Sequence, residues 1–258
     1  MAAVLRYQAE GPVALVRLDR PDVRNALDAD LIEQLHSTFE RLASDPAIRA
    51  IVLSGEGKAF CGGADVAMMR ESLELTREQN VAGGRAFSEM FRAIDRCPKP
   101  VVAKIHGAAL GGGSGLVAVC DIAIAASDAV FGFTEVKLGI IPAVISPFVL
   151  SKIGASHARA LFLTGERFDA KRAQAIGLVH EVVVSDTLDV AVERVVTEIL
   201  SAGPSAIAAI KKLIARVRET AYGESLELTA EATAMQRVSP EGQEGLRAFL
   251  ERRSPSWK

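Results

Sequence analysis

The residues best suited to chemistry lie in one stretch, residues 105–135, with the sequence IHGAALGGGSGLVAVCDIAIAASDAVFGFTE. An apolar run enters this stretch, three glycines interrupt it at 111–113, a helix-compatible piece follows, and Glu135 closes it. Glycine lets a substrate lie directly against the backbone because it has no Cβ. The first N–H groups of the following helix are unpaired and lie at the positive end of its dipole. Such a place suits a developing negative charge, either a phosphate or an oxyanion.

A second glycine turn, Gly62 and Gly63, also runs into a helical pattern. Two backbone N–H groups that converge on one carbonyl oxygen would form an oxyanion hole, although the residues alone favour two ordinary tight turns. Glu135 stands between Phe133 and Leu138, where partial burial would raise its pKa and suit it to general acid–base work. The alternative for Glu135 is an exposed acid at the end of a strand.

A dinucleotide fingerprint is the main competing interpretation of the glycines. Residues 113–118 fit the pattern G-x-G-x-x-A after a strand. The helix would be short for a crossover, however, because the next apolar run begins at Ile122. The acid expected after the second strand would also fall at Asp128 rather than Glu135. Titration with NAD would distinguish the two sites, and a serine hydrolase is disfavoured because G-x-S-x-G is absent around Ser114.

The elements that must position these residues alternate between strand and helix. Residues 13–18 and 50–53 are predicted strands, and Asp28 or Asp30 can cap a helix with apolar residues at helical spacing. Residues 71–96 predict a polar helix with a break or a flexible point at Gly83 and Gly84. The last third of the chain is mostly helical. We therefore expect an α/β fold with a helical tail, divided into a core at 1–200 that holds the site and a helical region at 201–258.

Composition fits an ordinary globular protein of 258 residues, with 49% hydrophobic and 24% charged residues. The formal net charge of -2 gives no reason to expect nucleic acid or an anionic membrane as partner. The apolar run at 101–126 contains Lys104 and glycines, which disfavours a membrane span. The first residues do not resemble a secretory signal, and three cysteines leave at least one unpaired. We expect buried, reduced thiols and a cytoplasmic location.

Several motifs in order resemble the enoyl-CoA hydratase/isomerase family, the crotonase-like proteins, over essentially the whole chain. The matching pieces are RPDVRNAL (20–27), KAFCGGAD (58–65), IHGAALGGG (105–113), CDIAIAA (120–126), FGFTEVKLGIIP (131–142), FLTGERFDAKRAQAIGLVHEVV (162–183) and EGLRAF (244–249). The resemblance implies a spiral of repeated ββα units whose C-terminal helices pack in trimers, often paired into hexamers. It implies an acyl-CoA thioester as substrate and no separate cofactor or metal, because the chemistry moves only protons and water.

The resemblance also implies roles for individual residues. The N–H groups of Ala64 and Gly112 would form the oxyanion hole for the thioester carbonyl, and Glu135 matches the family's second catalytic glutamate. Arg24 matches a basic position near the CoA phosphates, and Phe249 would lie over the CoA of a neighbouring subunit. The substrate-binding positions implied in this way are Arg24, Ala26, Ala64, Asp65, Val66, Met68, Gly111, Gly112, Gly115, Pro142 and Phe249.

One departure from the family bears on the reaction. Hydratases of this family hold one water between two glutamates, and the first of them would stand at Gly115. A single base can instead move a proton between Cα and Cγ, as in a 3-enoyl-CoA to 2-enoyl-CoA isomerase, or can activate water alone. The segment at 140–154 resembles the branch that hydrates methylglutaconyl-CoA and related branched acyl-CoAs. We expect a hydratase or dehydratase of that kind, with an isomerase or a non-catalytic acyl-CoA binder as alternatives.

Overall fold

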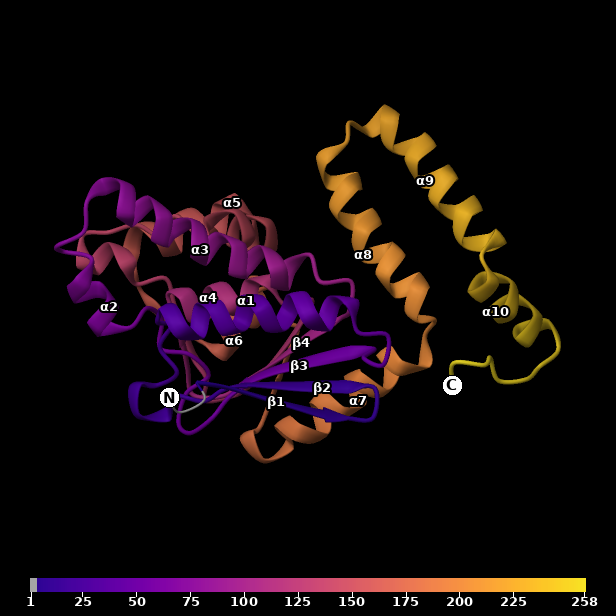
Figure 1. The fold of residues 1–258 in the computed structure, drawn as a ribbon, viewed down its shortest axis with the longest axis horizontal. Helices are drawn as coiled ribbons and strands as arrows, with labels where there is room; N and C mark the ends of the chain where they lie inside the picture. The colour runs from indigo at the N-terminus through magenta and orange to yellow at the C-terminus, as the bar shows by residue number, and fades with distance from the viewer. Residues whose placement is uncertain (1–3) are drawn as a thin grey trace.

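Residues 4–258 are described by a computed structural model of the chain, in which two β-sheets and their covering helices form the core (Figure 1). The larger sheet has six strands in the order β1-β2-β3-β4-β6-β9, and the smaller has three in the order β5-β7-β8. The strands are β1 (Leu5–Glu10), β2 (Val13–Leu18), β3 (Ala50–Gly55), β4 (Val101–Ile105), β5 (Ala108–Leu110), β6 (Ile122–Ala126), β7 (Val130–Gly132), β8 (Arg167–Asp169) and β9 (Glu181–Val183). From β2 to β9 the larger sheet is parallel, whereas β1 joins β2 and β8 joins β7 in antiparallel fashion.

Helices follow the strands and continue past them to the end of the chain. The α-helices are α1 (Ala29–Ser44), α2 (Val66–Glu71), α3 (Arg77–Asp95), α4 (Gly112–Val119), α5 (Ser146–Thr164), α6 (Ala170–Ala175), α7 (Leu188–Ser201), α8 (Pro204–Glu219), α9 (Tyr222–Val238) and α10 (Pro240–Leu250). Short 3-10 turns lie at η1 (Pro21–Val23), η2 (Glu135–Leu138) and η3 (Ser185–Thr187). None of the helices in residues 4–258 has both the length and the apolar character needed to cross a membrane.

The central parallel strands of the larger sheet, β3, β4 and β6, are buried on both faces, as is typical of a parallel sheet. In β3, Ile51 and Leu53 pack into the large core that includes α1, α3 and α4, while Ala50 and Val52 pack on the opposite face against α7. The alternation follows from the period of two in a strand. Figure 1 shows the resulting order of layers, with α7 on one side of the sheet and α1 and α3 on the other.

The predicted first helix is confirmed. The Asp28 carboxylate caps α1 by accepting a hydrogen bond of 2.8 Å from the Leu31 N–H. This bond satisfies one of the N–H groups that a helix start leaves unpaired. The buried face of α1 consists of Leu31, Ile32, Leu35, Phe39 and Leu42.

Of the two expectations for Gly83 and Gly84, the break is wrong, because α3 runs through both glycines, and the flexible point stays a prediction. A capping box between Thr76 and Gln79 fixes the start of α3. Further along, Phe91 packs in the core and anchors the helix. The polar helix predicted at 71–96 therefore begins later, at Arg77.

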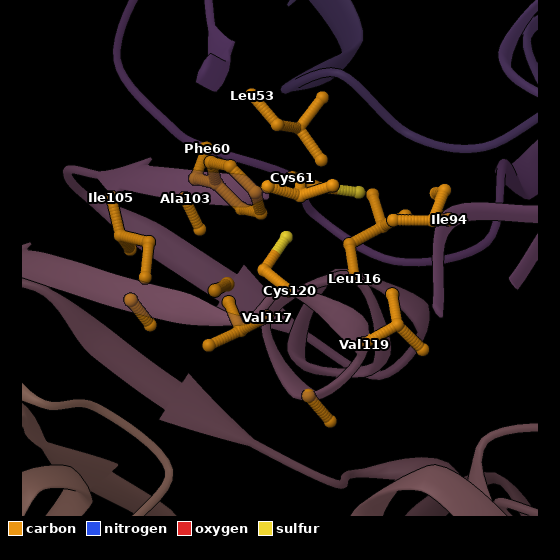
Figure 2. Close-up of a cluster of buried hydrophobic side chains, with 14 of the residues drawn as sticks. Leu53, Phe60, Cys61, Ile94, Ala103, Ile105, Leu116, Val117, Val119 and Cys120 are labelled. Atoms are coloured by element: carbon orange, nitrogen blue, oxygen red, sulfur yellow. The ribbon is translucent and has the colours of Figure 1, made fainter. Parts of the chain in front are cut away.

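Helix α4 lies entirely inside the protein, with every residue from Gly113 to Val119 buried. Figure 2 shows Leu116 and Val117 of this helix gathered with Phe60, Ala103 and Ile105 in one cluster of buried side chains. Gly113 lies so close to the neighbouring chain that a Cβ there would be 2.3 Å from the Cys61 carbonyl oxygen. This close approach brings both glycine turns of the sequence together.

Helices α8, α9 and α10 form an arm that extends away from the sheets (Figure 1). Lys211 on α8 ties the arm to the core through an ion pair of 2.6 Å with Asp121. The Arg49 guanidinium donates to the carbonyls of Leu200 and Trp257, each at 2.8 Å. The division into regions 1–200 and 201–258 stays a prediction.

Candidate active site

Among the backbone N–H groups that donate no hydrogen bond within residues 4–258 are those of Ala64 and Gly112. Gly112 is the first residue of α4, so its N–H has no acceptor within the helix. The residue before it, Gly111, has φ 51° and ψ −118°, a conformation that requires glycine. Its own N–H donates to the Gly132 carbonyl at 2.8 Å, which fixes the entry to the helix.

The Ala64 N–H has a fixed position because the residues on both sides of it form backbone hydrogen bonds with Leu27. The Leu27 N–H donates to the Gly63 carbonyl at 2.7 Å, and the Asp65 N–H donates to the Leu27 carbonyl at 2.9 Å. Gly63 adopts φ 102°, which only glycine reaches without strain. The two glycine turns are thus more than ordinary turns, because each leaves one unpaired N–H at the wall of a shared cavity.

This cavity has a volume of about 120 Å³ and is apolar apart from one carboxylate. Its lining consists of Ala64, Phe87, Phe91, Gly112, Glu135, Ile141, Pro142, Ala143, Val144 and Ile145. The structure therefore brings together the three predicted catalytic positions, Ala64, Gly112 and Glu135, and also the predicted Pro142.

Glu135 opens the turn η2, directly after the short link that follows β7. A Cβ built on Gly111 would be 3.1 Å from Glu135 Oε1, so the carboxylate lies against the glycine turn. The other oxygen, Oε2, is buried and has no hydrogen-bond partner within residues 4–258. Burial raises the pKa of Glu135 above its ordinary value of 4.5, although a hydrogen bond from its own backbone N–H opposes the shift. The group is thus a desolvated carboxylate with a free oxygen, which is what a general base requires.

The position of the absent first glutamate is filled by apolar side chains. Gly115 is buried, and a Cβ there would lie 2.4 Å from Ile145 Cγ2 and 3.1 Å from Phe91 Cζ. A side chain at 115 could enter only if Ile145 moved. Glu135 is therefore the only carboxylate among the residues that line the described cavity.

Arg20 and Asn25 hold this site together, and sequence reasoning did not single them out. The Arg20 guanidinium forms ion pairs of 2.8 Å with both Asp28 and Asp65 and donates to the Ala26 carbonyl. The buried Asn25 has φ 55° and donates from Nδ2 to the carbonyls of Glu56 and Ala59, each at 2.8 Å. The sequence signal for Arg20 and Asn25 was that both lie in RPDVRNAL, one of the motifs that resemble the family.

Asp65 acts as a structural acid in this arrangement. Its carboxylate accepts a hydrogen bond of 2.7 Å from the Ala67 N–H and so caps α2. Burial would raise the pKa of Asp65, but the bonds from the Ala67 N–H and from Arg20 outweigh it and lower that pKa. Asp65 therefore stays ionised and orients the turn that carries the Ala64 N–H.

The other predicted binding positions lie around the site or away from it. Arg24 has an exposed side chain, and its carbonyl accepts from the Gly62 N–H at 2.7 Å, so it stands beside the second glycine turn. Ala26 is buried, Met68 is half-buried, and Val66 is 69% exposed. Phe249 lies on α10 in the arm and does not line the cavity. The substrate contacts of all these residues stay predictions.

Comparison with known proteins agrees with this geometry. The family model described as Enoyl-CoA hydratase/isomerase matches residues 8–258. The chain is 32% identical to the crotonyl-CoA hydratase of Syntrophomonas wolfei, over 97% of the chain and 96% of that protein. It is 33% identical to the short-chain-enoyl-CoA hydratase of Clostridium acetobutylicum, over 95% and 94%. The crystal structure of an enoyl-CoA hydratase from Shewanella pealeana superposes with a TM-score of 0.95 at 39% identity, covering 99% and 96% of the two chains.

The chain belongs to the enoyl-CoA hydratase/isomerase family. The resemblance found in the sequence motifs is thereby confirmed, and with it the crotonase-like α/β fold with C-terminal helices and the expected enzyme class. The roles of individual residues stay predictions. Within residues 4–258 no three His, Cys, Asp or Glu side chains gather as metal ligands would.

Proposed function

We propose that the protein adds water across the double bond of a 2-enoyl-CoA thioester, and catalyses the reverse dehydration, with Glu135 as the acid–base group. The observation that carries this proposal is the unpartnered, buried Glu135 Oε2 beside two N–H groups that also lack partners. A carboxylate and two free donors on one small apolar cavity match the needs of a reaction that passes through a thioester enolate.

The proposed reaction needs a single carboxylate. Glu135 takes a proton from water as the water oxygen forms a bond to Cβ, and the electrons of the double bond move toward the thioester carbonyl. The Ala64 and Gly112 N–H groups donate to the resulting oxyanion, a contribution of about 3–4 kcal/mol per donor in comparable sites. The protonated Glu135 then returns its proton to Cα. The balance is one water added and no cofactor consumed.

The acyl group that best fits the cavity is short and uncharged. The segment at 140–154, which resembles the methylglutaconyl-CoA branch, supplies Ile141 and Ile145 to the lining. The described lining contains no basic side chain. A distal carboxylate of the substrate would lose its hydration there without a cation to replace it. We therefore favour an uncharged branched acyl-CoA over methylglutaconyl-CoA itself.

Double-bond isomerisation of a 3-enoyl-CoA is the second candidate, and the packing at Gly115 favours it. Ile145 and Phe91 occupy the place where a second carboxylate would hold the attacking water. Glu135 alone could take a proton from Cα and return it at Cγ, with the same two N–H groups holding the enolate oxygen.

We propose that the protein works as a homotrimer or homohexamer built through the arm. The arm exposes large apolar side chains, including Met235 at 72%, Phe249 at 81% and Leu250 at 78%. Clusters of exposed apolar side chains indicate a surface that another chain covers. We also propose a cytoplasmic location, because Cys61, Cys97 and Cys120 are free and buried thiols.

The experiment is a product-resolved assay in H₂¹⁸O with but-2-enoyl-CoA, 3-methylbut-2-enoyl-CoA, methylglutaconyl-CoA and a 3-enoyl-CoA. Labelled hydroxyacyl-CoA from the wild type, reduced about 10²–10⁴-fold in Glu135→Gln, supports the hydratase. Glu198→Gln, an exposed site on α7, is the matched control and keeps full activity. A shifted double bond without label identifies the isomerase instead. Binding of CoA esters without turnover refutes both reactions and identifies a non-catalytic binder.

A further inference from the structure

We infer that Phe91 and Ile145 are specificity-determining residues that limit the length of the acyl chain; the inference rests on the proposed binding of an acyl-CoA thioester in this cavity. Both side chains line the cavity that holds Glu135. Phe91 is 0% exposed and Ile145 is 3% exposed, so neither can swing into solvent to make room.

The glycine at 115 allows these two side chains to close over the cavity. Gly115 follows Gly112 by one turn on α4 and therefore lies on the same face of the helix. Ile145 and Phe91 both reach within contact distance of the Cβ that Gly115 lacks. The acyl chain that extends from the two N–H groups along this face therefore meets a fixed apolar wall.

Phe91 also belongs to a row of aromatic rings that runs from this small cavity toward a much larger cleft. Its ring lies between Phe87 and Phe148, with centroid distances of 6.3 Å and 5.9 Å. Phe87 lines the small cavity, whereas Phe148 lines a cleft of about 710 Å³ between α8 and the core. Removing the Phe91 ring would therefore enlarge the small cavity and leave room for the distal part of a longer chain.

A fixed wall of the Phe91 and Ile145 side chains predicts that the protein binds acyl-CoA esters with short acyl chains most tightly. Each added methylene strengthens binding while apolar space remains and weakens it once the chain must displace packed side chains. We expect the wild type to bind butanoyl-CoA or hexanoyl-CoA more tightly than decanoyl-CoA, by about tenfold or more. Phe91→Ala should remove or invert that preference.

The experiment measures dissociation constants of saturated butanoyl-, hexanoyl- and decanoyl-CoA by calorimetry for wild type, Phe91→Ala and Phe148→Ala. Phe148 is the matched control, since it is also aromatic and belongs to the same row but does not line the small cavity. It should keep the wild-type order. Phe91→Leu, which removes less of the wall, gives a smaller shift and is the variant of choice if circular dichroism finds Phe91→Ala unfolded.

Saturated esters undergo no hydration, so this test is independent of the reaction. Affinity that rises up to decanoyl-CoA in the wild type, or a chain-length order that neither Phe91 variant changes, overturns the inference. Retained chain-length selection in a protein that hydrates no enoyl-CoA would refute the proposed function and leave the inference standing.

Discussion

Glu135 combines two properties that are seldom found together in a carboxylate: it is partly buried, and no group in residues 4–258 donates a hydrogen bond to its Oε2. Desolvation stabilises the protonated form, so the folded protein holds this proton more tightly than an exposed glutamate would. The same environment makes the ionised form a stronger base. The residue is therefore suited to accept a proton and then return it.

The pH dependence of activity should report this raised pKa. The base must be ionised to react, so kcat/KM should fall as pH decreases through the pKa of Glu135. The acid limb should accordingly lie above the ordinary value of 4.5, with a slope of about tenfold per pH unit. A pH–rate profile measured on the free enzyme checks this, and Glu198→Gln serves as control. A limb at or below the ordinary glutamate pKa would contradict a desolvated base.

Gly115 should tolerate a side chain only when Ile145 is shortened. In the wild-type background, Gly115→Ala brings a methyl group to 2.4 Å from Ile145 Cγ2, and overpacking of this kind costs about 1–3 kcal/mol of stability. In an Ile145→Ala background the 2.4 Å contact is gone, and the remaining contacts with the Cβ of residue 145 and with Phe91 Cζ are 3.1 Å each. Most of the loss should therefore disappear. Urea unfolding of the two single variants and the double variant measures this coupling. Additive losses would contradict the packing of Ile145 over Gly115.

Sequence motifs located most of the residue-level site but could not predict what fills it. Ala64, Gly112 and Glu135 follow from glycine turns and from motif matches, and they do lie on one cavity. The packing of Ile145 over Gly115 could not be predicted, because the two residues lie far apart in the sequence and meet only in the folded protein. Arg20 was missed for a related reason, since Arg20 and Asp65, with which it forms an ion pair, are far apart in the sequence and meet only after folding.

Among the elements, α4 is constrained at both ends, because Gly112 at its start lines the cavity while its last residues are buried. The buried end is satisfied by Lys152 of α5, whose ammonium donates to the Cys120 carbonyl at 2.7 Å. Burial lowers the pKa of Lys152, with the nearby Cys120 and Asp121 acting in the opposite direction. A cation at this position also complements the negative end of the helix dipole.

Lys152→Met should therefore destabilise the protein, because the carbonyl at the end of α4 would remain buried without a donor. The expected loss is about 1–3 kcal/mol in the free energy of unfolding. Urea denaturation measures it, with Lys171→Met on the exposed surface of α6 as control. Equal stability of the two variants would refute the capping role of Lys152.

Helix α3 shows where periodicity and composition mislead at the scale of an element. Glycines favour a break, yet the helix continues through Gly83 and Gly84 because Phe91 and its neighbours anchor it and the Thr76 capping box starts it. Strand and helix types elsewhere followed from apolar patterns, as in α1 and β2. The continuation of α3 through Gly83 and Gly84 depends on tertiary packing, which a local sequence pattern does not contain.

Gly83→Ala should stabilise α3. A Cβ at Gly83 would have no neighbour within 4 Å, and the residue already has helical conformation. The gain expected from the lower entropy of the unfolded chain is about 0.5–1 kcal/mol. Thermal unfolding at fixed protein concentration checks the direction. A lower melting temperature would indicate that the glycine serves a conformation of α3 other than the one described.

At the scale of the whole molecule, the core and the arm differ in how they bury apolar surface. The core buries most of its apolar side chains between sheet and helices, whereas α8 to α10 bury only Leu228 and Ala248. These three helices extend away from the sheets in Figure 1. The sequence indicated helices in this region. It could not indicate which of their faces remain uncovered, because that depends on contacts between helices.

The proposed assembly through the arm predicts that self-association is lost when the exposed apolar end of α10 becomes charged. Phe249 and Leu250 are 81% and 78% exposed at the end of α10, so Phe249→Glu/Leu250→Glu removes little packing within one subunit. A charge buried at a subunit interface without a partner is strongly unfavourable, so the double variant should have a smaller mass in light scattering. Val190→Glu on α7, at 65% exposure, is the control and should keep the wild-type mass. If Phe249 also covers a neighbour's CoA, the double variant should raise KM more than it lowers kcat. An unchanged mass would show that α10 does not mediate assembly.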